Sequence, residues 1–216
     1  MSSWGITASI VIGLIIYSVY RLRRKTRQQQ FIENFVFPQS VSQKVKKTYP
    51  HLGDKELRLV MLGLREYFVI CNKAGRNMVA MPSQVVDVAW HEFILFTRKY
   101  QAFCDKAFGR YLHHTPAEAM PDPKLATEGI KRAWRLACAR ERIKAFEPTR
   151  LPLLFALDRQ LNIEGGFTYA LDCTKGGGDY CASHIGCTSS CSGDSGHDSD
   201  SGCSGDSGCG GGCGGD

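Results

Sequence analysis

The feature that most restricts what this chain can fold into is an uncharged run near its N-terminus, WGITASIVIGLIIYSVY, from Trp4 to Tyr20. A helix of these 17 residues has a length of roughly 25 Å, which is close to the lower limit for crossing a bilayer. Five basic residues follow at once: Arg21, Arg23, Arg24, Lys25 and Arg27. Because basic residues resist translocation, this order predicts a single-pass membrane protein with its N-terminus outside and its C-terminal domain in the cytoplasm.

Two other interpretations of the run are a secretory signal that is removed and a buried core helix. A signal sequence has positive charge before the apolar run and a small-residue cleavage site after it. Here MSSW lacks the charge and RLRRK stands where the cleavage site would be. A core helix would carry polar residues at intervals, and this run has no charged residue. The pattern therefore favours a transmembrane helix.

The other end of the chain is a low-complexity tail from Cys173 to Asp216. It holds 14 Gly, 9 Ser, 7 Cys and 6 Asp among 44 residues. Such a segment cannot bury enough apolar surface to offset its chain entropy, so we expect it to be disordered. The sequence thus divides into an anchor with its basic cluster at 1–27, a helical domain at 28–172 and a glycine-rich, cysteine-rich tail at 173–216.

The middle segment is typical of an all-α domain, because it has no sustained alternation of apolar and polar residues. One helix is expected from Asp54, a candidate cap, to Gly75, which would end it. Ser83 is the candidate N-cap of the next, which we expect to run unbroken to Cys104. Its apolar stripe follows steps of three and four residues: Val86, Trp90, Phe93, Thr97, Tyr100 and Cys104. Further helical segments are expected at 122–146 and 149–163.

A polar cluster is predicted beside that stripe. Asp87 and His91 are four residues apart, so the carboxylate can accept a hydrogen bond from the imidazole. His113 and His114 lie between Gly109 and Pro116, where a turn can carry one of them back towards His91. These residues indicate a divalent metal site or an acid-base pair. The alternative is a buried polar network that pins the loop, since the ligand count is short for a metal.

Cys104 is predicted to be a small buried hydrophobe, because it shares the stripe of Trp90 and Phe93. A second candidate metal site lies in the tail, within CASHIGCTSSC. Cys181, His184, Cys187 and Cys191 are separated by two, two and three residues, which is short enough to surround one tetrahedral zinc ion. A scavenging site for Cu(I) or zinc would need less order. The alternative is a disordered tail whose cysteines bind nothing specific.

The stretches YPHLGDKELRLVMLGLREYFVIC and MPSQVVDVAWHEFILFTRKYQAFCDKAFGRYLHHTP resemble the bacterial members of the glycine-rich domain-containing protein family. The likeness covers about Tyr49 to Met120 and recurs in the Gly/Cys-rich C-terminus. The residues on which the resemblance is based are Pro82, Ser83, Val86, Asp87, Trp90, His91, Tyr100, Phe103, Cys104, Gly109, His113 and His114. The resemblance implies no particular activity. Some relatives have a second histidine two positions after the first, and the present chain has Phe93 there, which argues against a metal pair on one helix.

The leading functional hypothesis is a membrane-anchored, non-enzymatic binding or scaffold protein whose tail binds metal. The alternative is a metal-assisted hydrolase or acid-base enzyme that uses Asp87, His91 and His113 or His114. No GxSxG, HExxH or phosphate-loop motif supports the enzyme. The sequence does not identify a cofactor, and zinc is the candidate. Membrane lipid is the expected partner, and a protein is a further candidate. Nucleic acid is disfavoured, because no aromatic residues are interleaved with the basic face of Lys131 and Arg135.

Overall fold

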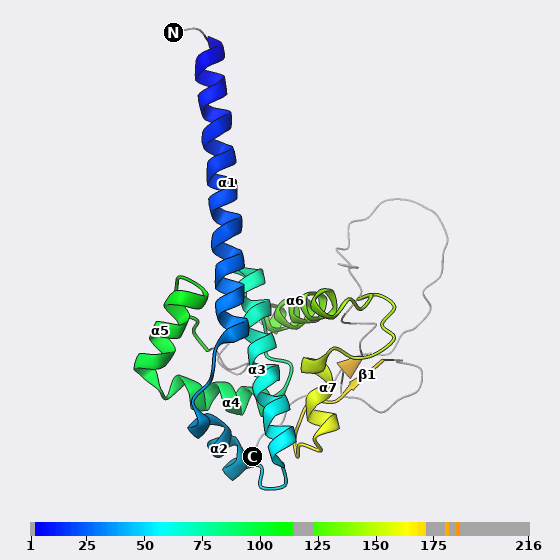
Figure 1. The fold of residues 1–216 in the computed structure, drawn as a ribbon. Helices are drawn as coiled ribbons and strands as arrows, with labels where there is room; N and C mark the ends of the chain where they lie inside the picture. Colours follow the sequence, from blue (N-terminus) through cyan, green and yellow to red (C-terminus); the bar gives the residue numbers. More distant parts are fainter. Residues whose placement is uncertain (1–2, 115–122, 172–179, 182–184, 186–216) are drawn as a thin grey trace, which may run out of the picture.

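The computed structural model describes residues 3–114, 123–171, 180–181 and 185, and its regular secondary structure is almost all helix (Figure 1). Its helices are α1 (Ser3–Asn34), α2 (Gln39–Thr48), α3 (Asp54–Ala74), α4 (Gln84–Ile94), α5 (Thr97–Ala107), α6 (Pro123–Glu141) and α7 (Leu153–Gln160). Two short strands, β1 (Tyr169–Ala170) and β2 (Tyr180–Cys181), pair in parallel, and β2 lies within the predicted tail segment. The expectation of an all-α domain is confirmed.

Helix α3 is the centre of the packing, because it contacts α1, α2, α4, α6 and α7. Its apolar residues recur every three or four positions, and Val60, Leu64 and Phe68 are fully buried. The helix ends where expected, at Gly75, whose φ of 68° lies in the left-handed region that favours glycine. Its N-cap is Gly53 rather than Asp54, and the carboxylate of Glu56 accepts a hydrogen bond from the Gly53 amide.

The helix predicted from Ser83 to Cys104 is two helices, α4 and α5. The break falls at Leu95 and Phe96, and Phe96 has a ψ of 56°, outside the helical region. The spacing of three and four continues across the break, so the apolar stripe gave no sign of it. Residues on both sides of the break still reach one core, since Phe93, Tyr100 and Cys104 are all fully buried. The expectation that Cys104 is a buried hydrophobe is confirmed.

The membrane prediction is wrong. Among the helices that the structure describes, none combines the length with the apolar character that crossing a bilayer requires. Helix α1 is long, but it continues without a break past the uncharged run and through the basic residues from Arg21 to Arg27. The uncharged run is also shorter than the ~20 residues that a spanning helix usually needs. The predicted single-pass topology, with the N-terminus outside and the C-terminal domain cytoplasmic, is therefore wrong as well.

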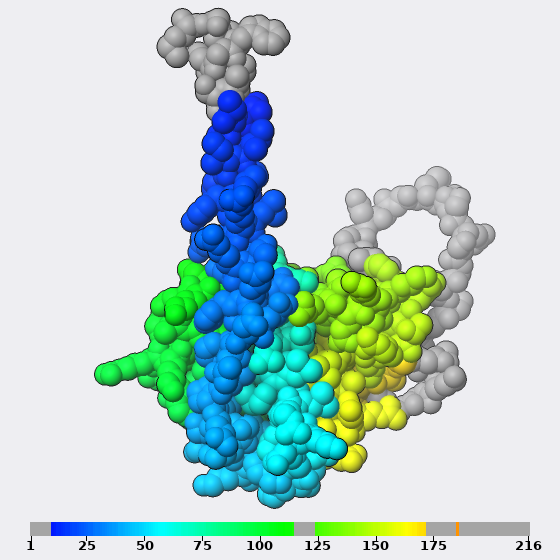
Figure 2. Space-filling model, in the orientation of Figure 1, coloured from blue at the N-terminus to red at the C-terminus, as the bar shows by residue number. Residues whose placement is uncertain are grey.

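The two ends of α1 have different surroundings (Figures 1 and 2). The upper part stands away from the body, and its apolar side chains from Ile10 to Leu22 are exposed. The lower part packs into the core, where Ile32 is fully buried and Phe35 contacts Phe93 and Phe103 with ring centroids 5.7 and 4.7 Å apart.

An ion-pair bridge reinforces the attachment of α1. Arg140 of α6 pairs with Glu33 of α1 at 2.8 Å and with Glu66 of α3 at 2.9 Å. Its guanidinium therefore joins three helices, and the two carboxylates raise the pKa of Arg140. The charge of Arg140 also contributes to lowering the pKa of Glu33, behind the larger effect of the hydrogen bond from Gln29.

Candidate metal centre

Helix α4 carries two of the predicted site residues, and its N-terminus is fixed by a buried carboxylate. Ser83 is the N-cap, as expected, and its hydroxyl accepts a hydrogen bond from the Val86 amide at 3.4 Å. The same hydroxyl donates to Asp158 of α7 at 2.7 Å. Asp158 also accepts from the amides of Gln84 and Val85, at 2.6 and 3.2 Å. The first turn of α4, which includes Asp87, is thereby held against α7.

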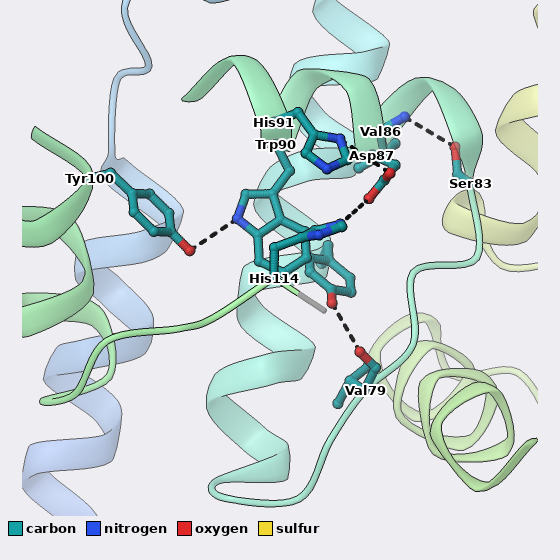
Figure 3. A network of polar contacts seen from close by, with 9 residues as sticks. Val79, Ser83, Val86, Asp87, Trp90, His91, Tyr100 and His114 are labelled. Atoms are coloured by element: carbon teal, nitrogen blue, oxygen red, sulfur yellow. Dashed lines mark hydrogen bonds and ion pairs between the residues drawn. The ribbon is translucent and has the colours of Figure 1, made fainter. Parts of the chain in front are cut away.

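Asp87 lies between two imidazoles (Figure 3). One carboxylate oxygen of Asp87 is 2.8 Å from His114 Nε2, and the other is 3.3 Å from His91 Nδ1. The two rings are close to each other as well, with centroids 4.1 Å apart. One candidate ligand atom from each of the three residues lies within 4.8 Å of the other two. The predicted approach of a histidine from the following turn is therefore present, and that histidine is His114.

A chain of buried hydrogen bonds places His114. Trp90 Nε1 donates to the Tyr100 hydroxyl at 3.0 Å, and that hydroxyl donates to the Leu112 carbonyl. The segment after α5 is thereby tied to α4 two residues before His114. The His114 ring then packs on Trp90 with centroids 4.6 Å apart and an interplanar angle of 67°. The orientation of His114 follows from this packing, which the sequence pattern alone did not reveal.

His113 does not join the cluster. Its ring lies against Tyr111, with centroids 4.8 Å apart, and its side chain is exposed at the edge of the same pocket. In the predicted tail site, His184, Cys187 and Cys191 lie outside the described residues. Cys181 belongs to β2, but nothing is described of its side chain. The tail zinc site therefore stays a prediction.

The triad of Asp87, His91 and His114 lines a pocket of about 450 Å³. The side chain of His91 is 50 % exposed, whereas those of Asp87 and His114 are 20 % and 13 % exposed. The other lining residues come from α3, α4 and α6 and from the segments before α4, after α5 and after α7: Tyr67, Cys71, Arg76, Asn77, Met78, Val79, Ala80, Met81, Gln84, Trp90, Arg110, Leu112, His113, Ala126 and Phe167. The cluster therefore has a cavity beside it large enough for a small molecule.

Two titratable groups in the pocket wall are neutral at physiological pH. Burial raises the pKa of Tyr67 well above its usual range, and the Tyr67 hydroxyl donates to the Val79 carbonyl at 2.9 Å. Burial likewise raises the pKa of Cys71 to about 12, so its thiolate is scarce and it is a poor metal ligand. Among the described residues that line the pocket, the candidate ligand atoms that converge are those of Asp87, His91 and His114.

These three donors fit a zinc-type ion. Imidazole nitrogen and carboxylate oxygen are usual zinc ligands at about 2.0 to 2.2 Å. Tetrahedral bonds of that length set neighbouring ligand atoms a little over 3 Å apart, by simple geometry from those bond lengths. The 2.8 and 3.3 Å separations join two different oxygens of Asp87 to the histidines. One ligand atom from each of the three residues lies within 4.8 Å of the other two, so small side-chain movements would bring the set to the tetrahedral spacing. In the structure, His114 Nε2 is hydrogen-bonded to one oxygen of Asp87, and His91 Nδ1 lies at ion-pair distance from the other.

Comparison with known proteins gives one match. The model of the UCP032817-like family matches residues 27–187, which is most of the chain and includes the whole triad. No curated protein matches, and no solved structure matches. The description of the matched family does not mention a glycine-rich domain. The resemblance to the glycine-rich domain-containing family therefore stays a prediction. The chain belongs to the UCP032817-like family.

Proposed function

We propose that the triad of Asp87, His91 and His114 binds one divalent ion of the zinc type, which activates water for hydrolysis in the adjoining pocket. The observation that carries this proposal is the convergence of three ligand atoms within 4.8 Å at the wall of a cavity of about 450 Å³. Structural zinc sites usually have four protein ligands, whereas hydrolytic sites have three and a water. Three ligands beside a cavity favour the second type.

The competing interpretation is a hydrogen-bonded network that only pins the loop to α4. A purely structural network is normally sealed from water, because burial is what makes its hydrogen bonds decisive for folding. His91 is half exposed and faces the pocket. Packing therefore does not account for His91, although it accounts for the contact of His114 with Trp90.

A metal ion in this position would lower the pKa of a bound water and supply a hydroxide near neutral pH. The ion would thereby supply the nucleophile for hydrolysis, in which a bond from the water oxygen would replace the bond to the leaving group, and the leaving group would take up the proton. The protein's part is to hold the ion with two neutral imidazoles and one carboxylate, and to admit substrate through the pocket. Trp90 restricts the orientation of one ligand ring.

This proposal develops the enzymatic alternative from the sequence. The non-enzymatic scaffold role, a protein partner and metal binding by the tail stay predictions. The tail matters for the experiment, however, because thiolates are ligands for soft metals and the tail contains seven cysteines.

Full-length protein is stripped with a chelator, dialysed against zinc and measured by elemental analysis. His91→Asn and His114→Gln each keep a hydrogen-bonding nitrogen near the position that contacts Asp87 while removing the imidazole. We expect each to lose about one zinc equivalent relative to wild type, because two protein ligands hold zinc far less tightly than three. Any contribution of the tail is the same in every variant and cancels in the comparison.

His113→Gln is the matched control, since His113 borders the same pocket without belonging to the triad. It should bind as much zinc as the wild type. Circular dichroism melts identify variants that fail to fold. Equal zinc content in wild type, His91→Asn and His114→Gln would exclude the metal centre and leave the polar network as the interpretation.

A further inference from the structure

The described lining of the pocket carries more positive than negative charge. Arg76 and Arg110 both line the pocket, and Asp87 is the one acidic residue in its described lining. In the proposed site, Asp87 is a metal ligand, so its charge is directed towards the ion. The rest of the described wall therefore offers positive charge without a matching negative group.

Arg110 is held in place by backbone atoms rather than by a carboxylate. Its guanidinium donates to the Gly75 carbonyl and to the Tyr111 carbonyl, the latter at 3.2 Å. Two of its five N–H groups are satisfied in this way, and the full charge is retained. The charge of Arg110 also acts on Cys71 in the pocket wall, where it opposes the effect of burial on the thiol pKa.

Arg76 follows directly on Gly75, so the turn at the end of α3 brings both arginines to the same side of the pocket. Among the described residues, neither Arg76 nor Arg110 forms an ion pair with a carboxylate. By contrast, Arg140 in the helical body is paired with two. Planar guanidinium groups bind phosphate and carboxylate oxygens through two parallel hydrogen bonds.

Another part of the pocket lining is apolar. It consists of Met78, Val79, Met81, Leu112, Ala126 and Phe167. Tyr67 and Cys71 add neutral surface, as their raised pKa values require. A ligand that uses the whole pocket therefore combines a group for the guanidinium side with an apolar body for this wall.

We infer that the pocket recognises small molecules that carry one anionic oxygen group, a phosphate or a carboxylate, on an apolar body. Arg76 and Arg110 bind the anionic group, and the metal centre lies next to it. The inference rests on the proposed function for the role of the metal, but the anion recognition itself depends on the two arginines.

The test uses full-length protein and three probes of similar size: phenyl phosphate, benzoate and neutral benzyl alcohol. Binding is measured by isothermal titration calorimetry on zinc-loaded and on chelator-stripped protein. We expect one of the two anions to bind at least about tenfold more tightly than benzyl alcohol, which corresponds to about 1.4 kcal/mol. Which anion binds more tightly distinguishes a phosphate site from a carboxylate site.

Arg76→Gln and Arg110→Gln retain a hydrogen-bond donor and remove the charge. Each should weaken binding of the preferred anion about tenfold and leave benzyl alcohol unaffected, because a hydrogen bond from a charged donor to an anion is stronger than one from a neutral donor. Arg98→Gln, an exposed arginine of α5 that does not line the pocket, is the matched control and should bind like the wild type.

The two proposals fail in different ways. Anion binding that is lost in the arginine variants but persists in stripped protein supports the recognition site, whatever the zinc content shows. Two results would overturn the recognition site: equal affinities for all three probes, or anion affinities unchanged in both arginine variants. If the triad still binds zinc in that case, the proposed metal centre is unaffected.

Discussion

Asp158 and Ser83, which are 75 positions apart, form a buried hydrogen bond of 2.7 Å that joins α7 to the first turn of α4. Asp158 is only 3 % exposed, and its carboxylate also accepts from the Gln84 and Phe167 amides at 2.6 and 2.9 Å. These donors satisfy the carboxylate in place of water. The negative charge at the N-terminus of α4 is also favoured by the helix dipole.

Asp158→Asn should therefore be among the most destabilising changes on this face of the protein. An amide nitrogen cannot accept hydrogen bonds, so at least one buried backbone N–H loses its partner. We expect the free energy of unfolding to fall by about 3 kcal/mol, measured by urea denaturation. Asp105→Asn is the control, because Asp105 is exposed on α5 and accepts only from Gln101 in the described contacts. A fall of similar size in both variants would contradict the capping role.

Tyr100→Phe tests the link between the core and the metal centre. The change leaves the buried Trp90 N–H and the Leu112 carbonyl without the hydroxyl that joins them, at a cost of about 2 kcal/mol in unfolding free energy. Because Leu112 is two residues before His114, zinc affinity should fall as well. Tyr111→Phe is the matched control, since the Tyr111 ring packs on Tyr100 at 5.3 Å. Zinc affinity unchanged in Tyr100→Phe would show that His114 is positioned without this bridge.

Gly63→Ala is expected to destabilise the protein although alanine favours helix formation. A methyl group at Gly63 would meet Leu157 Cδ1 at 2.5 Å and Val86 Cγ2 at 2.9 Å, where α3, α4 and α7 meet. Overpacking of this kind costs about 1 to 3 kcal/mol, which exceeds the helix-propensity gain of about 1 kcal/mol. The control is Gly13→Ala in α1, where nothing lies within 4 Å. Thermal melts should show a lower Tm for the first variant and no loss for the second.

Acid should weaken the contribution of Glu33. The hydrogen bond from Gln29 and the nearby Arg140 hold its pKa below the ordinary value of 4.5, against an opposing effect of burial. A carboxyl whose pKa is lower when folded stabilises the protein above 4.5, and this contribution is lost as the pH falls through the folded pKa. The effect is small because the side chain is 33 % exposed.

Urea midpoints for wild type and Glu33→Gln measure this contribution. The difference between the two proteins should be present at pH 7 and vanish as the pH falls below the folded pKa. The control is Glu147→Gln, which removes an ion pair with Lys144. The side chains of Glu147 and Lys144 are 81 % and 83 % exposed. A difference for Glu33→Gln that is constant over the whole range would contradict the assignment.

The three buried cysteines of the helical domain, Cys71, Cys104 and Cys138, should resist alkylation in the folded protein. Burial raises the pKa of all three thiols, to about 12 for Cys71 and about 11 for Cys138. Iodoacetamide treatment at pH 8 followed by peptide mass spectrometry should find them unmodified in buffer and modified in urea. Rapid modification of Cys71 in buffer would mean that the pocket wall opens.

The sequence predicted those features that local chemistry determines. The end of α3 at Gly75, the cap at Ser83 and the contact between Asp87 and His91 depend on residues at most four positions apart. The break at Leu95 and Phe96 was missed because the apolar spacing continues through it. The choice of His114 over His113 depends on packing against Trp90, and the cap from Asp158 depends on a distant helix. The membrane prediction failed because it treated the uncharged run as a separate helix, whereas α1 continues from this run through the basic residues that follow.

The triad has a further consequence for how this protein is assembled and how it can be modified. Asp87 and His114 are 27 positions apart, so all three ligands come from α4 and the segment that leads away from α5. Short loops close at little entropic cost, so this constellation can form early in folding. Residues 83–114 therefore carry every ligand, but transplanting them into another helical scaffold would also need a carboxylate at the position of Asp158 and aromatic side chains at the positions of Tyr67 and Phe68, which pack on Trp90.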